Sequence, residues 1–240
     1  MPLVSRSSIE RMERPETTLA ARAGLRAGYG LSNYVTISDG FAYHGHNGGV
    51  EGGLTELAYL PDQSVGYVFF INSGNGSASE KIGKLIHGYL TRDQQKPDLP
   101  PAVPLNNASL GPFFGYLEPI TPRQEIMRCL ERILGVVKLT CANGKLVARP
   151  MLGKRKVYLA TSDILFREEK EPMATLAPIP LSADGPRMQT SWTMLRPISA
   201  LAVWLEWGLS ALSLALMITA VLFALVGCHE SYSVSCRHRA

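Results

Sequence analysis

Residues 28–74 read "GYGLSNYVTISDGFAYHGHNGGVEGGLTELAYLPDQSVGYVFFINSG", and this stretch decides the fold of the first half of the chain. The runs on either side of Asp39-Gly40 are rich in β-branched and aromatic residues, and an Asp-Gly pair between two such runs indicates a hairpin. Pro61 marks another turn before "VGYVFFIN", which has strong strand composition. Four strands joined by short turns predict an antiparallel meander.

A helix is expected directly after this meander. The segment "SASEKIGKLIHGYL" can begin at a cap on Ser77 or Ser79. Its apolar residues recur at helical spacing, at Ile82, Leu85, Ile86 and Leu90. An antiparallel sheet with one packed C-terminal helix is an α+β layer. Such a unit covers its sheet incompletely, and "YVFFI" is apolar on both faces, so we expect a further layer on the second face.

The rest of the chain divides by composition. The segment "DQQKPDLPPAVPLNNA" is too rich in proline for a helix or a strand ladder. After it come a helix in "RQEIMRCLERIL" and six short strand-like runs with hairpin signals at Asn143-Gly144 and Asp184-Gly185. They predict a small antiparallel sheet or barrel without evident chemistry, with its carboxylates on a solvated face. The expected parts are an exposed lead-in (1–27), the sheet and helix (28–92), a Pro-rich linker (93–108), a small β-rich domain (109–197), a transmembrane helix (198–227) and a polar tail (228–240).

The membrane prediction depends on "ISALAVWLEWGLSALSLALMITAVLFALV", residues 198–226, whose only charge is Glu206. About 20 apolar residues suffice for an α-helix to cross the hydrocarbon core. Trp204 and Trp207 lie near one end, where an interfacial aromatic belt places them. A buried core helix is the alternative, but a chain of 240 residues is small to enclose one of this length. Membrane lipid is therefore the expected partner of 198–227. The first residues contain no apolar signal-peptide segment.

Composition disfavours two other classes of function. The net charge is +4, but the basic residues are scattered, so no nucleic-acid partner is expected. None of the four cysteines forms a C-x-x-C pair, which disfavours a zinc or redox module. Cys129 and Cys141 are expected to be buried free thiols, with pairing left open for an oxidising compartment.

His44 and His46 leave three interpretations open. At this spacing on a strand the two side chains share a face, as two metal ligands would. An open catalytic metal site needs about three protein ligands. An H-x-H-x-D motif would need aspartate where Gly48 stands, so no metal and no cofactor is predicted. The other two interpretations are a glycine-rich strand end with packed histidines and the wall of a hydrolase active site.

A resemblance to a known family supports the interpretation as the wall of a hydrolase active site. Residues 28–74 and the helix after them resemble the C-terminal part of the β-lactamase-related serine hydrolases, which include class C β-lactamases, penicillin-binding proteins and related esterases. His46-Asn47-Gly48 matches their third motif, in its His-x-Gly form. The resemblance implies a partial β-lactamase/transpeptidase-like fold over about residues 11–92. It also implies that His46 faces the active site, that His44 lies further away, and that the N–H of Gly49 is an oxyanion donor.

The family's other motifs are missing from this chain. Ser-x-x-Lys is absent, since "SIER" at Ser8 has arginine where the basic lysine is needed, and so is Tyr-x-Asn. We therefore expect a truncated or partial membrane-anchored serine hydrolase, acting in full-length form on an ester, amide or β-lactam, with residues 28–197 outside the cytoplasm. The alternative is a non-catalytic, membrane-anchored binding or assembly protein that uses a degraded hydrolase fold.

Overall fold

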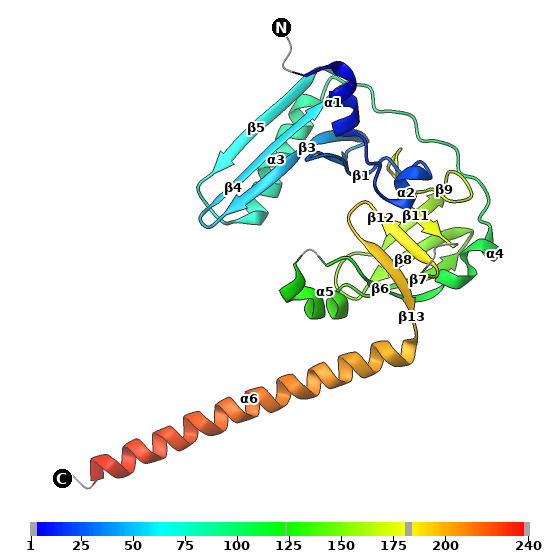
Figure 1. Ribbon diagram of the computed structural model, residues 1–240. Helices are drawn as coiled ribbons and strands as arrows, with labels where there is room; N and C mark the ends of the chain where they lie inside the picture. The colour runs from blue at the N-terminus through cyan, green and yellow to red at the C-terminus, as the bar shows by residue number, and fades with distance from the viewer. Residues whose placement is uncertain (1–3, 123, 181–183, 238–240) are drawn as a thin grey trace. The chain divides into compact units, whose positions relative to one another are not determined.

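The computed structural model describes residues 4–122, 124–180 and 184–237, with side chains as far as Leu225 (Figure 1). Its contacts separate two compact units, Met1–Pro197 and Ile198–Ala240. The coarse expectation of an α+β chain with an apolar C-terminal helix is confirmed, and the strands of the first unit form a sheet and a barrel.

The described residues of the first half form a five-stranded antiparallel sheet. Its order is that of the chain: β1 (Gly28–Tyr29), β2 (Tyr34–Ser38), β3 (Phe41–Val50), β4 (Gly53–Leu60) and β5 (Val65–Ile71). The meander prediction is confirmed, with the short β1 as an addition. At the expected hairpin Asp39 and Gly40 have φ of 53° and 91°, the left-handed values that a tight two-residue turn requires.

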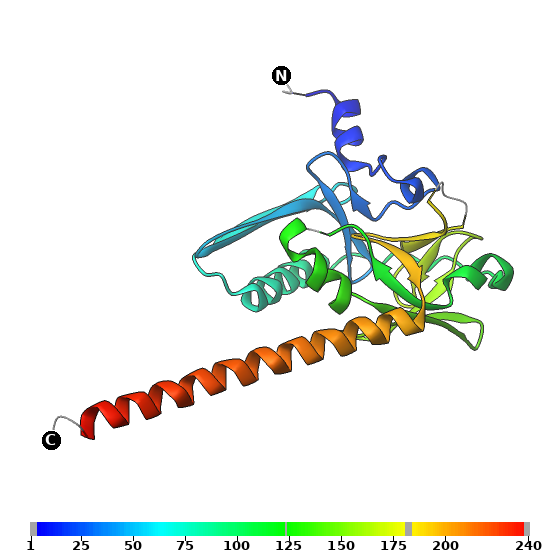
Figure 2. The same cartoon turned by 60° about the horizontal axis from the view of Figure 1, so that its bottom comes forward.

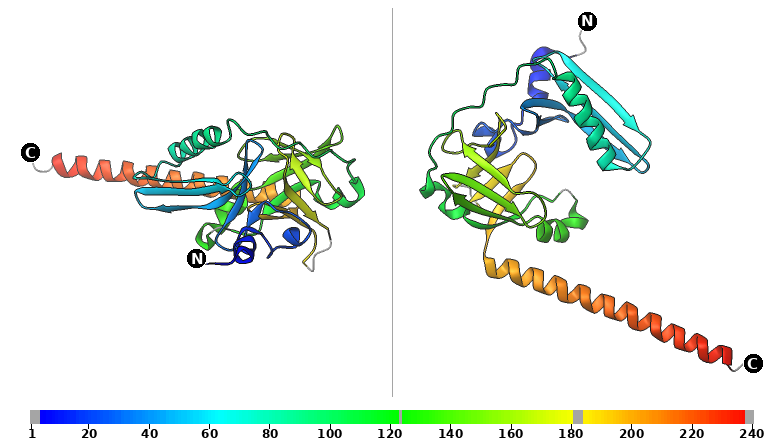
Figure 3. Two further views of the ribbon diagram at one scale, coloured as in Figure 1. Left: turned by 90° about the horizontal axis from the view of Figure 1, so that it is seen from above. Right: turned by 180° about the vertical axis from the view of Figure 1, so that it is seen from behind.

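One face of this sheet is covered by α3 (Gly76–Leu90), which lies along it in Figures 2 and 3. The expected cap was wrong. The helix begins before Ser77 because the Asn75 side chain accepts a hydrogen bond from the N–H of Ala78 at 3.0 Å. On the opposite face, apolar side chains from three neighbouring strands are exposed: Val50, Leu57, Val68 and Phe70. This open face fits the expectation that something further should cover the sheet.

The lead-in is more ordered than the sequence predicted. It contains α1 (Arg6–Glu13) and α2 (Leu19–Arg22). Ala20 and Leu25 are buried in a small core with Ala177 of the second region. The expectation of an exposed segment therefore fails for this part, because its few apolar side chains find a partner distant in sequence.

The second region is a closed eight-stranded barrel among the described residues. Around the barrel the order is β10-β11-β12-β13-β6-β7-β8-β9. The strands are β6 (Gly115–Pro119), β7 (Val137–Ala142), β8 (Lys145–Pro150), β9 (Lys156–Ala160), β10 (Phe166–Glu168), β11 (Ala174–Ile179), β12 (Arg187–Thr190) and β13 (Met194–Ile198). The short α4 (Asn107–Leu110) and η1 (Gly111–Phe113) add Leu110 and Phe113 to the barrel core. Of the two architectures left open, sheet or barrel, the structure has the barrel.

Several details of this region differ from expectation. The helix predicted in 123–134 is a 3₁₀ turn, η2 (Glu125–Met127), followed by α5 (Arg128–Leu134), and residue 123 lies outside the described residues. The run 188–195 is two strands, β12 and β13, with a turn between them. Asp184-Gly185 lies in a turn, although residues 181–183 before it are not described. The hairpin at Asn143-Gly144 is confirmed.

Two expectations about polar and thiol groups were wrong. Cys129 and Cys141 are free but exposed. Cys129 lies on α5, and Cys141 lies near the end of β7, opposite Leu146. Glu118 is not on a solvated face. Its side chain is 2 % exposed and pairs with Arg132 and Arg196 at 2.8 and 2.6 Å, so two cations compensate the buried charge.

The second unit is α6 (Ala200–Arg237). Within its portion Ala200–Leu225, an 18-residue stretch has a mean hydropathy of 2.3 and no buried residue, so this helix is long and apolar enough to cross a membrane. Near its start Val203 is buried. The helix continues to Arg237, beyond the expected end at residue 227. The tail predicted for 228–240 is therefore helical as far as it is described.

Candidate functional site

The four residues of the predicted motif lie together in the second half of β3. His46, Asn47 and Gly49 are exposed, and Gly48 is half-buried. The strand β2 pairs with β3 only as far as Gly45. Beyond it, the described residues pair β3 with β4 alone, so one edge of the strand is open along the motif. An open strand edge presents unpaired backbone groups.

Three aromatic side chains gather at the start of this open edge, around His46. The Tyr29 hydroxyl forms a hydrogen bond with His46 Nε2. The Tyr34 ring centroid lies 6.0 Å from that of His46 and 5.3 Å from that of Trp192, which comes from the turn between β12 and β13. We call Tyr29, Tyr34, His46 and Trp192 the aromatic wall. It combines residues from both halves of the first unit.

The phenols of this site are poor bases at neutral pH. Burial, and then the charges of Glu56 and Tyr29, raises the pKa of Tyr34 to about 12. Burial also raises the pKa of Tyr59 to about 12, with help from Glu13. Both hydroxyls therefore stay protonated and can donate hydrogen bonds. The Tyr29–His46 contact is the place in this cluster where a proton can be shared with an imidazole.

His44 shares the face of His46, as the spacing predicted, because their partners on β4 are Tyr59 and Leu57. It lies deeper, beside the Tyr59 ring at 5.8 Å between centroids. Burial lowers its pKa, and its Nδ1 is buried without a hydrogen-bond partner among the described residues. Asn47 alternates to the other face, opposite Glu56.

Gly45 separates the two histidines and is the most constrained glycine of the motif region. A Cβ there would lie 2.0 Å from the Leu57 carbonyl oxygen, so only glycine fits. Its N–H donates to Asn33 Oδ1 at 3.1 Å, and Asn33 Nδ2 donates to the Tyr59 hydroxyl at 2.7 Å. Tyr59 donates in turn to Glu13 at 2.8 Å. These contacts hold the start of the open edge in place.

Sequence reasoning missed Tyr29, Asn33, Tyr34, Tyr59 and Trp192. Tyr29, Asn33 and Tyr34 stand in "GYGLSNY", a short polar and aromatic run that could have drawn attention. The hydrogen bonds of Tyr29 and Asn33 join residues that are 12 to 26 positions apart in the sequence, and Trp192 comes from the barrel. No local pattern indicates such pairs.

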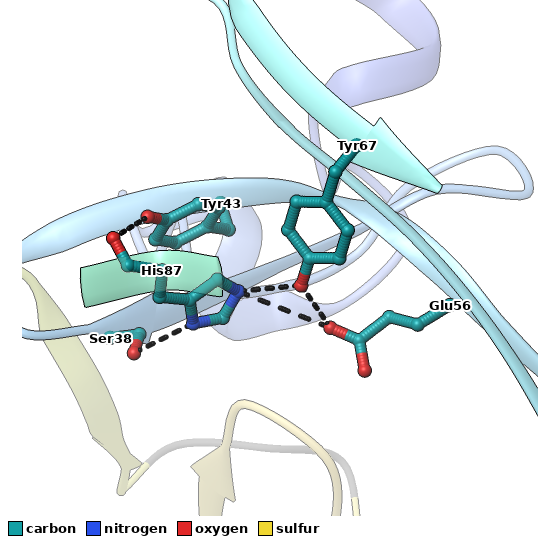
Figure 4. A network of polar contacts seen from close by, with 5 residues as sticks. All are labelled: Ser38, Tyr43, Glu56, Tyr67 and His87. Carbon is teal, nitrogen blue, oxygen red and sulfur yellow. Dashed lines mark hydrogen bonds and ion pairs between the residues drawn. The ribbon is translucent and has the colours of Figure 1, made fainter. Parts of the chain in front are cut away.

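A second polar cluster lies on the other face of the sheet, beneath α3 (Figure 4). His87 Nδ1 lies 2.9 Å from Ser38 Oγ, and His87 Nε2 lies 2.7 Å from the Tyr67 hydroxyl, which also donates to Glu56. The imidazole stacks on Tyr43, with centroids 3.9 Å apart. His87 is only 8 % exposed, so this cluster holds α3 against the sheet.

In the described part of the chain, no three His, Cys, Asp or Glu side chains lie close enough together to hold a metal ion. The two histidines of the motif share a face, but His46 Nε2 is engaged by Tyr29.

Comparisons with known proteins leave the family open. No family model matches the chain, and no curated protein matches it. A crystal structure of SurE with D-Leu aligns with a TM-score of 0.39 and 20 % identity, covering 81 % of this chain and 44 % of that one. A second SurE structure gives 0.38 and 18 %, covering 80 % and 43 %. The octameric penicillin-binding protein homologue from Pyrococcus abyssi gives 0.26 and 12 %, covering 80 % and 42 %. The chain thus spans less than half of each solved chain, and these likenesses are too loose to carry an argument about fold or function.

Proposed function

We propose that this chain supplies one wall of the acyl-transfer site of a membrane-anchored, β-lactamase-related serine hydrolase. The observation that carries the proposal is the position of His46. It stands at the start of an open strand edge, hydrogen-bonded to Tyr29, with Gly48 and Gly49 directly after it. The meander with α3 on one face would then be a partial β-lactamase/transpeptidase-like fold.

The chemistry of acyl transfer accounts for these residue types. A tetrahedral intermediate needs hydrogen-bond donors where its oxyanion develops, and backbone N–H groups on an open strand edge can serve. Glycines at positions 48 and 49 let a substrate approach the backbone closely. His46 would bind a substrate carboxylate or assist proton transfer, with Tyr29 orienting its ring. An ester, an amide or a β-lactam would each fit this arrangement.

The proposal places the nucleophile on polypeptide outside these 240 residues, since the chain contains no Ser-x-x-Lys. The open face of the sheet supports this placement. Val50 and Phe70 are 78 % and 76 % exposed, and apolar side chains at this exposure on one sheet face call for a packing partner. A helical layer bearing the nucleophile could cover this face and reach the open edge. The apolar segment Ala200–Leu225 would anchor the assembly in lipid.

The same face favours a second candidate function. A non-catalytic, membrane-anchored binding or assembly protein would also present an apolar sheet face to a partner. It would not need His46, and it would not need the open edge of β3.

A labelling experiment separates the two. The purified chain alone should hydrolyse neither nitrocefin nor p-nitrophenyl butyrate and should not react with a fluorophosphonate probe. A polypeptide extended by the coding sequence upstream of Met1 should gain both reactions. Turnover by the chain alone that is abolished by Ser73→Ala or Ser77→Ala would contradict the proposal. An extended polypeptide that folds but stays unlabelled would favour the binding protein.

A further inference from the structure

A cavity of about 410 Å³, partly open to solvent, is lined by barrel residues and by Thr36 and Ile37 of β2. Its floor is apolar and comes from inward positions on neighbouring strands: Leu117, Leu139, Leu176, Met188 and Leu195. An eight-stranded barrel is just wide enough to be filled by its side chains or to hold one small ligand. Among the residues that line the cavity, Ala148 has a small side chain that a larger one could replace. For comparison, an apolar cavity of about 150 Å³ is large enough to bind benzene.

The mouth of the cavity is polar and carries an excess of negative charge. Among the described residues that line it, the charged groups are Lys156, Glu168 and Glu171. Lys156 and Glu168 form an ion pair at 2.5 Å, and both stand on inner positions, opposite Ala148 and Tyr158. Glu171 accepts a hydrogen bond from the backbone N–H of Gly40 at 3.1 Å. In the part of the chain that the structure describes, no cationic side chain forms an ion pair with this carboxylate.

Two further groups at the cavity can contact a ligand. The hydroxyl of Thr175 is buried and has no hydrogen-bond partner among the described residues. The indole of Trp192 lines the mouth and is 58 % exposed. An indole face attracts cations.

We propose that this cavity binds a small amphiphilic ammonium compound, with an aliphatic or aromatic body on the apolar floor and a positive charge at the mouth. Burial of the apolar body against this floor removes its surface from water and so favours binding. The ammonium group pairs with Glu171 and lies near the Trp192 indole. A carboxylate of the same length would meet the negative charge of Glu171 instead, so the site discriminates by charge. The inference does not depend on the acyl-transfer proposal.

Hexylammonium can test this site, with hexanoate and hexanol as matched probes of the same chain length. The full chain is held in nanodiscs, and Trp204→Phe and Trp207→Phe leave Trp192 as the single fluorescent indole. Titration should change the Trp192 emission saturably with hexylammonium and not with hexanoate. Calorimetry on the chain without these two substitutions gives an independent affinity.

Charge variants give the sharpest test because their effects have opposite signs. Glu171→Gln should weaken hexylammonium binding on the order of tenfold, by removing a charge partner. Lys156→Met removes the competing cation and should strengthen binding. Glu169→Gln is the matched control, since Glu169 lies outside the cavity lining and pairs with Lys145, and it should change nothing.

Filling the cavity provides a second test. Ala148→Phe should abolish saturable binding while far-UV circular dichroism shows the barrel intact. Equal binding of hexanoate, or affinity unchanged by both Glu171→Gln and Lys156→Met, would overturn the proposal. Binding that persists in a folded Ala148→Phe variant, or no saturable binding of hexylammonium to the unaltered chain, would overturn it equally.

Discussion

His87 Nε2 lies 2.7 Å from the Tyr67 hydroxyl, which donates its own proton to Glu56. Since Tyr67 donates to the carboxylate, the imidazole must donate its Nε2–H to Tyr67, and Nδ1 then accepts from Ser38 Oγ at 2.9 Å. The network thus specifies one neutral tautomer of His87 (Figure 4). Desolvation, and then the hydrogen bond to Glu56, raises the pKa of Tyr67 far above its usual range, so the phenol remains the donor.

Removing this hydroxyl should destabilise the fold. Tyr67→Phe leaves a half-buried acceptor on Glu56 and a buried donor on His87 without their shared partner, which costs about 1–3 kcal/mol. Urea denaturation followed by circular dichroism measures the change. Tyr89→Phe is the control, because Tyr89 is 63 % exposed on the outer side of α3, and it should stay within about 0.5 kcal/mol. Equal effects of the two variants would mean that the network contributes nothing of its own.

Stability should fall in mild acid. Burial, despite nearby carboxylates, lowers the pKa of both His44 and His87 below the ordinary value of 6.5. As the pH falls below 6.5, the unfolded chain therefore binds protons first. The two neutral histidines contribute their full stabilisation of the folded state above about pH 6.5. As the pH falls below this value, the contribution is lost by at most about 1.4 kcal/mol per pH unit for each histidine. Urea titrations at about pH 7.5 and about pH 5.5, on either side of that value, measure this loss. In a double variant, His44→Gln with His87→Gln, the free energy of unfolding should depend less on pH. If its pH dependence equals that of the unaltered chain, other groups cause the loss of stability.

Gly45→Ala should be among the most damaging single-methyl changes in the sheet. The added Cβ would lie 2.0 Å from a backbone oxygen on β4, which cannot move without disturbing the ladder. Overpacking of this kind typically costs about 1–3 kcal/mol. Gly74→Ala, where a Cβ meets nothing within 4 Å, is the matched control. A melting temperature for Gly45→Ala as high as that of the control would show that β3 and β4 are less closely joined than the register indicates.

Membrane topology is open to direct labelling. We expect residues 28–197 outside the cytoplasm and the part after residue 227 inside. In a cysteine-free background, a single cysteine is introduced by Ser162→Cys or by Ser233→Cys, and intact cells are treated with an impermeant maleimide. Labelling at position 162 with protection at 233 would support this orientation, and the reverse pattern would place the first unit in the cytoplasm. Release of the chain by carbonate washing would contradict the anchor.

Local chemistry accounts for the parts of the fold that the sequence predicted correctly. Asp39-Gly40 and Asn143-Gly144 adopt positive φ values because their residue types tolerate them. The helix α3 forms where the apolar spacing predicted one, but Leu85 of that spacing is 75 % exposed and the residues that α3 buries are Gly83 and His87. The apolar segment after residue 198 forms a helix that is long and apolar enough to cross a membrane, as its composition predicted.

The parts that sequence reasoning missed depend on partners distant in the chain. β6 pairs with β7 and completes the barrel, although its composition, "GYLEP", does not mark it as a strand. Glu118 is buried because Arg132 and Arg196 arrive from other elements. The same holds for the candidate site: His46 and its glycines follow from a motif, whereas Tyr29, Tyr34 and Trp192 reach it only through the tertiary fold.

The most direct test of the central claim compares two histidines that share one face of β3. The extended polypeptide that carries the nucleophile is prepared with His46→Ala and, separately, with His44→Ala, and the rate of acylation is measured with nitrocefin and p-nitrophenyl butyrate. Loss of a positioned active-site group costs on the order of a hundredfold, so His46→Ala should lower the rate by about that factor, with His44→Ala doing much less. Equal and small effects at both positions would show that these histidines only pack, and would contradict the account.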